Sequence, residues 1–363
     1  MANINTILEK STKINSVDWD NLRFGVFFSD HIFMSDYEDG KWDEGNIIPY
    51  DSLDLEPANC TLHYGQTIFE GLKAFPSVKG GINIFRPEMN AKRMNKSAEL
   101  ICIPQYDVDN FIQALRELVK LDQDWIPKKR GESLYIRPFV FGSGNFLGVS
   151  ASKSYKFIII LSPVASYYAE GLNPVKIIVE TEHVRAVKGG LGSAKTAANY
   201  AASMLAGEKA HQKGYSQVLW LDGVERKYID EVGAMNIMFV INDELITPSL
   251  DKGTILAGIT RDSVLTLARD WGMKVSEREI SIDEVREAHK KGTLTEVFGT
   301  GTAAVISPVG LLNYKTENMI INDMKIGKYA QKFYDTITGI QYGEIEDPHN
   351  WIEHIKLLFC YYI

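Results

Sequence analysis

Apolar and polar residues recur at helix and strand spacings through the first half of the chain. In DVDNFIQALRELVKL (107–121) apolar residues recur at i, i+3 and i+4 after a starting Asp, which predicts an amphipathic helix. SLYIRPFVFG (133–142) and YKFIIILSPV (155–164) have the composition of strands, and the second is apolar enough to be buried on both faces. RFGVFFSDHIFMSDY is also strand-like, and INIFRPEMNAKRMNKSAEL predicts a short strand followed by a helix with Pro87 in its first turn.

The second half mixes strands, helices and hairpin turns. Strands are predicted at KIIVE, SQVLWL, AMNIMFVI and LTEVFG, and helices at 195–213, 259–271 and 326–341. VLWLDGVERKYIDE and MFVINDELITP predict hairpins with Asp-Gly and Asn-Asp turns. Because helices are mixed with hairpins and do not alternate strictly with strands, we expect an α+β fold of two domains. The predicted domains are 1–164, smaller and N-terminal, and 175–363, larger and C-terminal, with a linker at 165–174 where the pattern has no periodicity.

Composition and charge narrow the class of protein. The 363 residues carry a formal net charge of −8, which argues against nucleic acid or an anionic membrane as partner, since both need a basic face. No stretch reaches the roughly 20 apolar residues that span a bilayer. Cys60, Cys102 and Cys360 have no C-x-x-C spacing and are each expected to be small buried residues, which fits a reducing, cytoplasmic location. The seven histidines form no cluster, so no metal site is expected.

GGLGSAKT (189–196) leaves open whether Lys195 binds a phosphate or acts as a nucleophile. The stretch differs by one residue from the phosphate-binding loop G-x-x-x-x-G-K-[ST], with Ala194 in place of the second Gly. That loop needs Gly there so that backbone N–H groups can surround the phosphate. The later QVLWLDG resembles a magnesium-binding strand, but Gly223 follows Asp222 in a turn, so we expect Asp222 to face solvent. A nucleotide-binding module therefore remains only as an alternative.

Three further features suit a phosphate-bearing cofactor. GTGTAA (299–304) follows a strand, and its successive N–H groups could bind a phosphate; the expected helix does not follow, because AVISPVG reads as another strand. Gly258 leads into a helix whose first N–H groups could bind an anion. Glu231 lies at the edge of an apolar strand. A phosphate cofactor that forms an imine with Lys195 would use all of these features.

The sequence resembles the fold-type IV pyridoxal-phosphate enzymes and, within them, the branched-chain amino-acid aminotransferases. The matching runs occur in the order of the family, cover roughly residues 20 to 345, and are FGVFFSDHIFM, LHYGQTIFEGLKAF, FRPEMNAKRM, SLYIRPFVFG, GSAKTAANY, QVLWLDG, IDEVGAMNIMFV, TILAGITRDSVL and EVFGTGTAAVISPV. The resemblance implies a two-domain α+β architecture with the cofactor between the domains. The sequence differs from animal members of the family at two places. Ala304 and Ser307 replace the two cysteines of a C-x-x-C pair, and Ala234 replaces a Thr.

The resemblance also implies the site residues. Lys195 would hold pyridoxal 5'-phosphate as a Schiff base and later move the Cα proton, Glu231 would contact the pyridine nitrogen, and Tyr200 would contact the phenolic oxygen. The phosphate would be bound by Arg93, by the backbone N–H groups of Ile259 and Thr260, and by the hydroxyl of Thr302. The substrate pocket would comprise Phe24, Tyr64, Phe69, Tyr135, Arg137, Thr302 and Ala303, with Arg137 binding a distal carboxylate.

We therefore expect an aminotransferase that moves the amino group of leucine, isoleucine or valine to 2-oxoglutarate by a ping-pong Schiff-base mechanism. A D-amino-acid aminotransferase or an aminodeoxychorismate lyase of the same fold is the alternative, against which Arg137 and the aromatic pocket speak. A homodimer is expected, because in the family the loop equivalent to GSGNFLGVS completes the pocket of the neighbouring subunit.

Overall fold

The computed structural model describes residues 3–165 and 172–357, and the chain divides into two compact units. The N-terminal unit comprises Met1–Tyr167 and Gly339–Ile363, and the C-terminal unit comprises Tyr168–Thr338. The second division falls inside helix α7 (Lys328–Tyr342). Most of the predicted linker at 165–174 lies outside the described residues.

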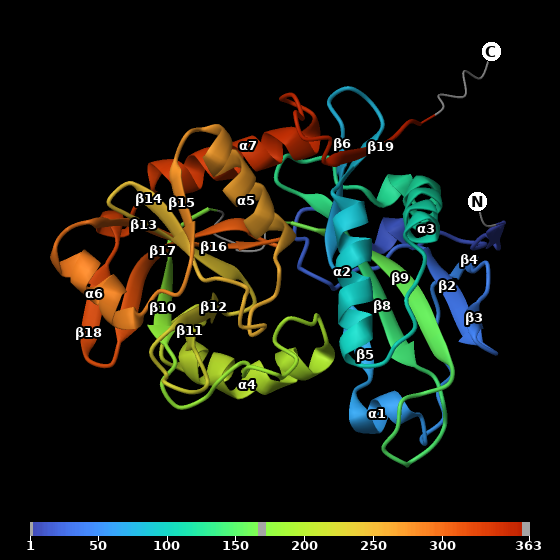
Figure 1. Ribbon diagram of the computed structural model, residues 1–363. Helices are drawn as coiled ribbons and strands as arrows, with labels where there is room; N and C mark the ends of the chain where they lie inside the picture. Colours follow the sequence, from blue (N-terminus) through green and yellow to red (C-terminus); the bar gives the residue numbers. More distant parts are fainter. Residues whose placement is uncertain (1–2, 166–171, 358–363) are drawn as a thin grey trace. The chain divides into compact units, whose positions relative to one another are not determined.

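The N-terminal unit is built on a ten-stranded sheet, counted over its described residues, with order β1-β4-β2-β9-β8-β6-β7-β19, β3 on β2 and β5 on β8 (Figure 1). Its strands are β1 (Asn5–Thr6), β2 (His31–Glu38), β3 (Lys41–Trp42), β4 (Asn46–Pro49), β5 (Thr67–Phe69), β6 (Leu72–Pro76), β7 (Ile82–Phe85), β8 (Ser133–Gly142), β9 (Tyr155–Val164) and β19 (Ile352–Ile355). Its helices are α1 (Cys60–Tyr64), α2 (Pro87–Leu100), α3 (Val108–Leu121) and the 3-10 turns η1 (Ile14–Ser16) and η2 (Gln123–Trp125). The pairings are antiparallel except that of β1 with β4.

The described part of the C-terminal unit has a nine-stranded mixed sheet of order β12-β11-β10-β17-β16-β13-β14-β15, with β18 on β17 (Figure 1). Its strands are β10 (Val175–Val179), β11 (Gln217–Leu221), β12 (Ile229–Val232), β13 (Asn236–Ile241), β14 (Glu244–Thr247), β15 (Lys274–Glu277), β16 (Leu294–Gly301), β17 (Val305–Tyr314) and β18 (Glu317–Ile320). Its helices are α4 (Ala197–Gln212), α5 (Ile259–Asp270), α6 (Ile282–Lys290), most of α7 and the 3-10 turn η3 (Asn322–Met324). Both predicted hairpins, β11–β12 and β13–β14, are confirmed, as is the α+β class.

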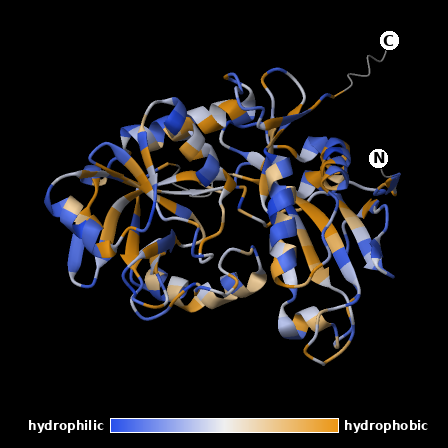
Figure 2. Cartoon of the chain, viewed as in Figure 1, coloured by the Kyte–Doolittle hydropathy of each residue, from blue (hydrophilic) through white to orange (hydrophobic). Residues whose placement is uncertain are grey.

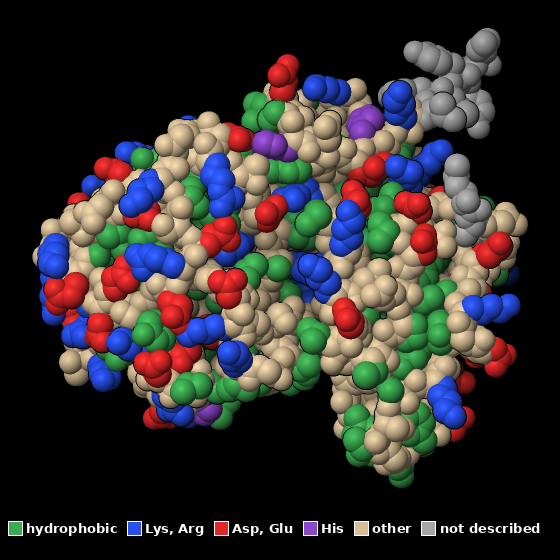
Figure 3. All heavy atoms as spheres, in the orientation of Figure 1, with side chains coloured by type: hydrophobic (Ala, Val, Ile, Leu, Met, Phe, Trp, Pro, Cys, Tyr) green, Lys and Arg blue, Asp and Glu red, His purple; other side chains and the backbone are tan. Residues whose placement is uncertain are grey.

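Hydropathy follows these elements. In Figure 2 the strands of both sheets are mainly hydrophobic, whereas the helices carry both hydrophobic and hydrophilic residues. On the face of the molecule that Figure 3 shows, Lys and Arg side chains are interspersed with Asp and Glu side chains. In the described part of the chain, no helix is both long and apolar enough to span a membrane.

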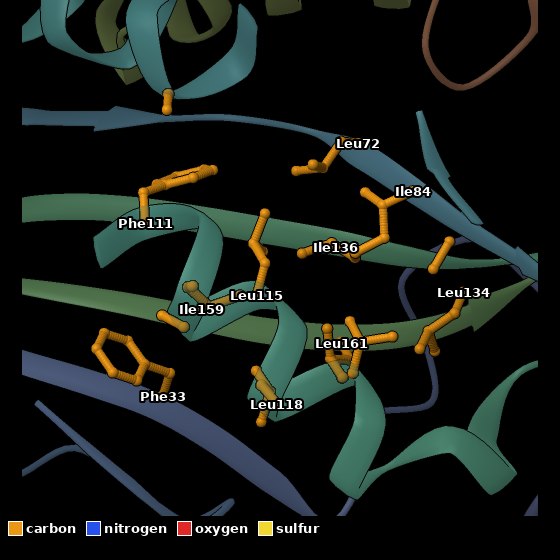
Figure 4. Close-up of a cluster of buried hydrophobic side chains, with 14 of the residues drawn as sticks. Phe33, Leu72, Ile84, Phe111, Leu115, Leu118, Leu134, Ile136, Ile159 and Leu161 are labelled. Atoms are coloured by element: carbon orange, nitrogen blue, oxygen red, sulfur yellow. The ribbon is translucent and has the colours of Figure 1, made fainter. Parts of the chain in front are cut away.

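Helix α3 shows why its sequence folds as predicted. The Asp107 side chain accepts a hydrogen bond from the backbone N–H of Asn110 at 2.9 Å, which caps the first turn. Phe111, Leu115 and Leu118 are fully buried on one face of the helix and point toward the sheet (Figure 4). The helical spacing of apolar residues in 107–121 therefore corresponds to the buried stripe of α3.

Several predictions differ from the structure. The strand-like segment before His31 forms a turn at Gly25, where φ is 67°, and β2 starts only at His31. Residues 339–363 belong to the N-terminal unit and not to the C-terminal domain, because β19 pairs with β7, with Ile352 opposite Phe85. Cys60 is buried as expected, Cys102 is exposed at a residue with φ of 58°, and Cys360 lies outside the described residues.

Candidate active site

Lys195 lies at the end of a loop, two residues before the first residue of α4. The amide of Asn199 donates to the carbonyl oxygens of Leu191 and Ala194, both at 2.8 Å, so the first turn of the helix fixes the loop that carries the lysine. Lys195 Nζ donates to the hydroxyl oxygen of Tyr200 at 2.7 Å. An amine and a phenol are thus held together by one short segment. The predicted helix at 195–213 begins two residues late, so Lys195 is in the loop.

Glu231 brings a buried carboxylate to the same unit. It lies on β12 with 3% of its surface exposed, and its Oε1 accepts from the backbone N–H of Leu256 at 2.8 Å. Burial raises the pKa of Glu231, and the nearby guanidinium of Arg185 opposes this rise. Tyr200, Glu231, Arg185 and Leu256 line one pocket of about 20 Å³, which places the phenol and the carboxylate at a common space.

Arg185 is a residue that the sequence analysis missed. Its Nε is 3.3 Å from Glu231 Oε2, an ion-pair distance without hydrogen-bond geometry. Its Nη2 donates to the carbonyl oxygens of Gly192, at 3.2 Å, and of Thr254. Arg185 therefore connects the loop of Lys195 to the carboxylate of Glu231. It lies in the polar segment TEHVRAVK, which has no periodicity that would single out one arginine.

The predicted phosphate contacts of this unit are Ile259 and Thr260, at the start of α5, and Thr302, in the turn after β16. Gly258 is the N-cap and has no side chain that could cap Ile259 or Thr260, and the first backbone N–H groups of α5 form the positive end of the helix dipole. A Cβ at Gly258 would collide with Asn236 Oδ1, so a side chain at this position would force Asn236 to move. Thr302 and Ala303 are half-buried in the turn between β16 and β17, and α5 packs on β16.

Asp222 does not face solvent as expected. It is 7% exposed, and its carboxylate accepts four backbone N–H groups of the following turn, from Val224, Glu225, Lys227 and Tyr228. Burial opposes ionisation, but the four donors outweigh it and lower the pKa of Asp222 to about 2. Its role is to organise the β11–β12 connection, which removes the magnesium-binding interpretation.

In the N-terminal unit, Arg93 is held by a carboxylate that the sequence analysis did not identify. Arg93 Nε and Nη2 donate to Glu70 Oε1 and Oε2 at 2.8 and 2.7 Å, and both side chains are buried. The predicted phosphate arginine thus has a fixed guanidinium. Glu70 stands in the run LHYGQTIFEGLKAF, but a single Glu after a strand gives no sign of a partner on a helix 23 residues later.

Four predicted substrate residues of the N-terminal unit lie together. The rings of Phe24 and Tyr135 meet edge to face with centroids 4.8 Å apart, and the guanidinium of Arg137 lies 4.6 Å from the ring centroid of Phe69. Arg137 Nη2 donates to the Tyr135 hydroxyl at 3.0 Å, while its buried Nε has no hydrogen-bond acceptor among the described residues. Tyr64 is not in this group, because its hydroxyl donates to the backbone oxygen of Leu147.

The chemical groups of this site can be compared with those that a particular cofactor would need. In the C-terminal unit an amine beside a phenol, a buried carboxylate and a helix N-terminus with glycine at the N-cap suit an aromatic aldehyde that has a ring nitrogen and a phosphate. Glycine at position 258 places no side chain over the first backbone N–H groups of α5, where a phosphate could bind. Within the described residues there is no group of three or more His, Cys, Asp or Glu that could hold a metal ion.

Comparisons with known proteins agree on one family. Residues 67–312 match the family described as amino-transferase class IV. The chain is 55% identical over 349 residues to branched-chain-amino-acid aminotransferase 2 of Bacillus subtilis, covering 96% of both chains, and 53% identical to a probable branched-chain-amino-acid aminotransferase of Staphylococcus aureus, covering 91% of this chain and 92% of that one.

Solved structures are similar over most of the chain. The branched-chain amino acid aminotransferase of Escherichia coli has a TM-score of 0.72 at 26% identity, covering 90% of this chain and 99% of that one. The T.th. branched-chain amino acid aminotransferase with pyridoxamine 5'-phosphate has a TM-score of 0.73 at 25% identity, covering 90% of this chain and 98% of that one.

Proposed function

We infer the reaction from the premise that the chain belongs to the class IV aminotransferases and, within them, to the branched-chain amino-acid aminotransferases. The enzyme moves the amino group of leucine, isoleucine or valine to 2-oxoglutarate, with pyridoxal 5'-phosphate as cofactor and by a ping-pong route. The observation that carries this proposal is the amine of Lys195, 2.7 Å from the Tyr200 hydroxyl in the unit that also buries Glu231.

Lys195, Tyr200 and Glu231 divide the chemistry. When bound, pyridoxal phosphate supplies an aldehyde that reacts with amines and a ring that takes up the electron pair left at the substrate Cα. Lys195, as a neutral amine, is the nucleophile and then carries the Cα proton. The carboxylate of Glu231 holds a proton on the ring nitrogen. The Tyr200 hydroxyl orients the Lys195 amine and the phenolic oxygen of the ring.

The remaining residues bind the phosphate and the two substrates. We assign the phosphate to Arg93, to the backbone N–H groups of Ile259 and Thr260, and to the hydroxyl of Thr302. Phe24, Phe69, Tyr135, Thr302 and Ala303 are assigned to the substrate pocket. The assignment of Tyr64, whose hydroxyl donates to the backbone oxygen of Leu147, rests on the family resemblance alone. Arg137 pairs with the distal carboxylate of 2-oxoglutarate or glutamate, and its buried Nε, without an acceptor among the described residues, supports this role.

We further propose a cytoplasmic homodimer.

To test the reaction, the purified protein is incubated with ¹⁵N-leucine and 2-oxoglutarate, and the formation of ¹⁵N-glutamate is followed by mass spectrometry. Transfer of the label is expected from the wild type and not from Lys195→Ala. The same assay is repeated with ¹⁵N-D-alanine as the amino donor. If the label is transferred from ¹⁵N-D-alanine and not from ¹⁵N-leucine, the protein is a D-amino-acid aminotransferase and this proposal is wrong. After borohydride reduction, peptide mapping is expected to find the cofactor on Lys195, and label on another lysine would overturn the assignment.

A further inference from the structure

Glu70 holds the guanidinium of Arg93 along one edge. The two hydrogen bonds, at 2.8 and 2.7 Å, form a bidentate pair between helix α2, which carries Arg93, and the segment that follows β5, which carries Glu70. Glu70 is 0% exposed. Since a bidentate carboxylate fixes the plane of a guanidinium as well as its position, Arg93 has little freedom to turn.

The carboxylate of Glu70 is itself held from two sides. Asn90, one helical turn before Arg93, donates from Nδ2 to Glu70 Oε2 at 2.7 Å, and the backbone N–H of Gly71 contacts the same oxygen at 3.3 Å. The backbone N–H of Glu70 donates to the carbonyl oxygen of Pro138 on β8 at 2.7 Å. The clamp, defined as Glu70 with Asn90, is thus anchored to the sheet and to the helix.

Glu70 also stands between two parts of the substrate pocket. Phe69 precedes it and contacts Arg137, and at Gly71, which follows it, a Cβ would collide with the Tyr135 hydroxyl. A change in the position of Glu70 would therefore alter the positions of both Arg93 and the pocket residues.

The clamp has a second physical effect. The negative charge of Glu70 offsets the positive charge of Arg93, which would be costly to bury without a partner.

We propose that Glu70 is a positioning residue for the cofactor: together with Asn90, it preorganises Arg93 to bind the phosphate. The inference rests on the proposed function, in which Arg93 contacts the phosphate of pyridoxal 5'-phosphate. A flexible arginine loses side-chain freedom when it binds an anion, and an arginine already held in place does not. Glu70 acts through Arg93 and does not touch the reacting atoms.

Glu70→Gln tests the proposal, since it keeps the size of the side chain but replaces one acceptor oxygen by an NH₂ group. With the full-length apoenzyme we expect the Kd for pyridoxal 5'-phosphate, measured by equilibrium dialysis, to rise about 10- to 100-fold. The Kd for pyridoxal, which has no phosphate, should change less than about twofold by the same reasoning. Glu70→Asp keeps the charge and should give a smaller rise for pyridoxal 5'-phosphate.

A matched control exists in the same unit. Arg130 and Glu344 form a bidentate pair of the same chemistry, at 2.8 and 3.0 Å, but both side chains are partly exposed. Glu344→Gln should leave both dissociation constants unchanged. If Glu70→Gln does not fold, Asn90→Ala tests the same clamp, with an expected rise of about 2- to 10-fold for pyridoxal 5'-phosphate.

Two results would overturn the proposal. An unchanged Kd for pyridoxal 5'-phosphate in Glu70→Gln, with a lower Tm, would assign Glu70 to fold stability alone. Equal losses for pyridoxal 5'-phosphate and pyridoxal would show that the clamp does not act through the phosphate. Arg93→Lys separates this failure from that of the proposed function: if Arg93→Lys also leaves the Kd unchanged, the phosphate role of Arg93 itself is wrong.

Discussion

At the scale of single residues, the charge of Glu231 depends on Arg185. Burial raises the pKa of Glu231, and among the groups that lower this pKa Arg185 has the largest effect. Without Arg185 the pKa of Glu231 should therefore rise further, so that Glu231 is protonated at a higher pH and loses the charge that its proposed role, holding a proton on the ring nitrogen, requires. For Arg185→Gln we predict that the acidic limb of the pH profile of kcat/KM moves to higher pH.

The control for Arg185→Gln is Arg226→Gln in the same unit. Arg226 is exposed, and its Nη1 donates to the carbonyl oxygen of Thr181 at 2.9 Å. The pH profile of Arg226→Gln should match that of the wild type. A uniform loss of activity in Arg185→Gln, with no shift of the acidic limb, would mean that Arg185 holds the loop of Lys195 and does not set the charge of Glu231.

Arg137 is the second residue with a predicted effect. For Arg137→Gln we expect the KM for 2-oxoglutarate to rise at least about tenfold, because a buried carboxylate loses its cation, and the KM for leucine to change little. The two half-reactions, measured separately, check this. The control is Arg116→Gln, which removes the charge from a partly exposed ion pair with Glu353. Equal losses for leucine and glutamate would show that Arg137 stabilises the pocket and does not select the substrate.

The sequence could identify some of these residues and not others. Lys195 precedes helix α4 by two residues and Tyr200 lies in its first turn, so their proximity follows from local spacing. Glu70 and Arg93 are 23 residues apart, and Arg185 and Glu231 belong to a loop and a strand. Their pairing depends on how the sheets order their strands, which no local pattern encodes. Roles taken from the resemblance, such as those of Thr302 and Ala303, remain predictions.

At the scale of elements, the β11–β12 connection depends on Asp222. Its folded pKa of about 2 lies below the ordinary value of about 3.9, so its contribution to stability is present above pH 4 and is lost as pH falls from about 4 toward 2. For Asp222→Ala we predict that the free energy of unfolding falls by about 1 to 3 kcal/mol at pH 7. This difference from the wild type should become smaller as the pH approaches 2. Urea unfolding at several pH values measures it, and a loss independent of pH would refute the charge effect.

Elements were predictable where period and caps agree. Strands β8 and β9 and helix α3 occur at the predicted residues, because long apolar patterns and an Asp cap coincide there. The segment before β2 has strand composition but forms a turn, since Gly25 adopts a left-handed conformation. Helix α6 was not predicted, although Ser281 caps it by accepting from the backbone N–H of Glu284. Its nine residues are too few for a clear period.

At the scale of the whole molecule, the division into units depends on a contact distant in sequence. The last strand of the described residues, β19, pairs with β7, and Arg116 on α3 pairs with Glu353, so the C-terminal segment belongs to the unit formed by the start of the chain. The boundary near residue 165 could be read from a loss of periodicity. The return of the chain to the first unit could not, because IEHI is short and carries no turn or cap signal.

The apolar surface around α1 leads to a last prediction, the homodimer. In the loop that follows β8, Leu147 is 65% and Val149 is 87% exposed, and Leu62 on α1 is 61% exposed. The loop is not a loose tip, since Tyr64 donates to the Leu147 oxygen and the N–H of Gly144 donates to Ser152 Oγ at 3.1 Å. Figure 3 shows hydrophobic side chains and few charges at this end of the N-terminal unit.

An ordered apolar patch of this kind is typical of an interface, because exposed apolar area costs free energy in water. We therefore expect a dimer by light scattering at assay concentration, and a shift toward monomer in Leu147→Asp. Activity should fall with dissociation if the loop completes the pocket of the partner. Val224→Asp changes an apolar residue that is 83% exposed on the β11–β12 connection and should have no effect. A fully active monomer in Leu147→Asp would show that each chain has a complete site of its own.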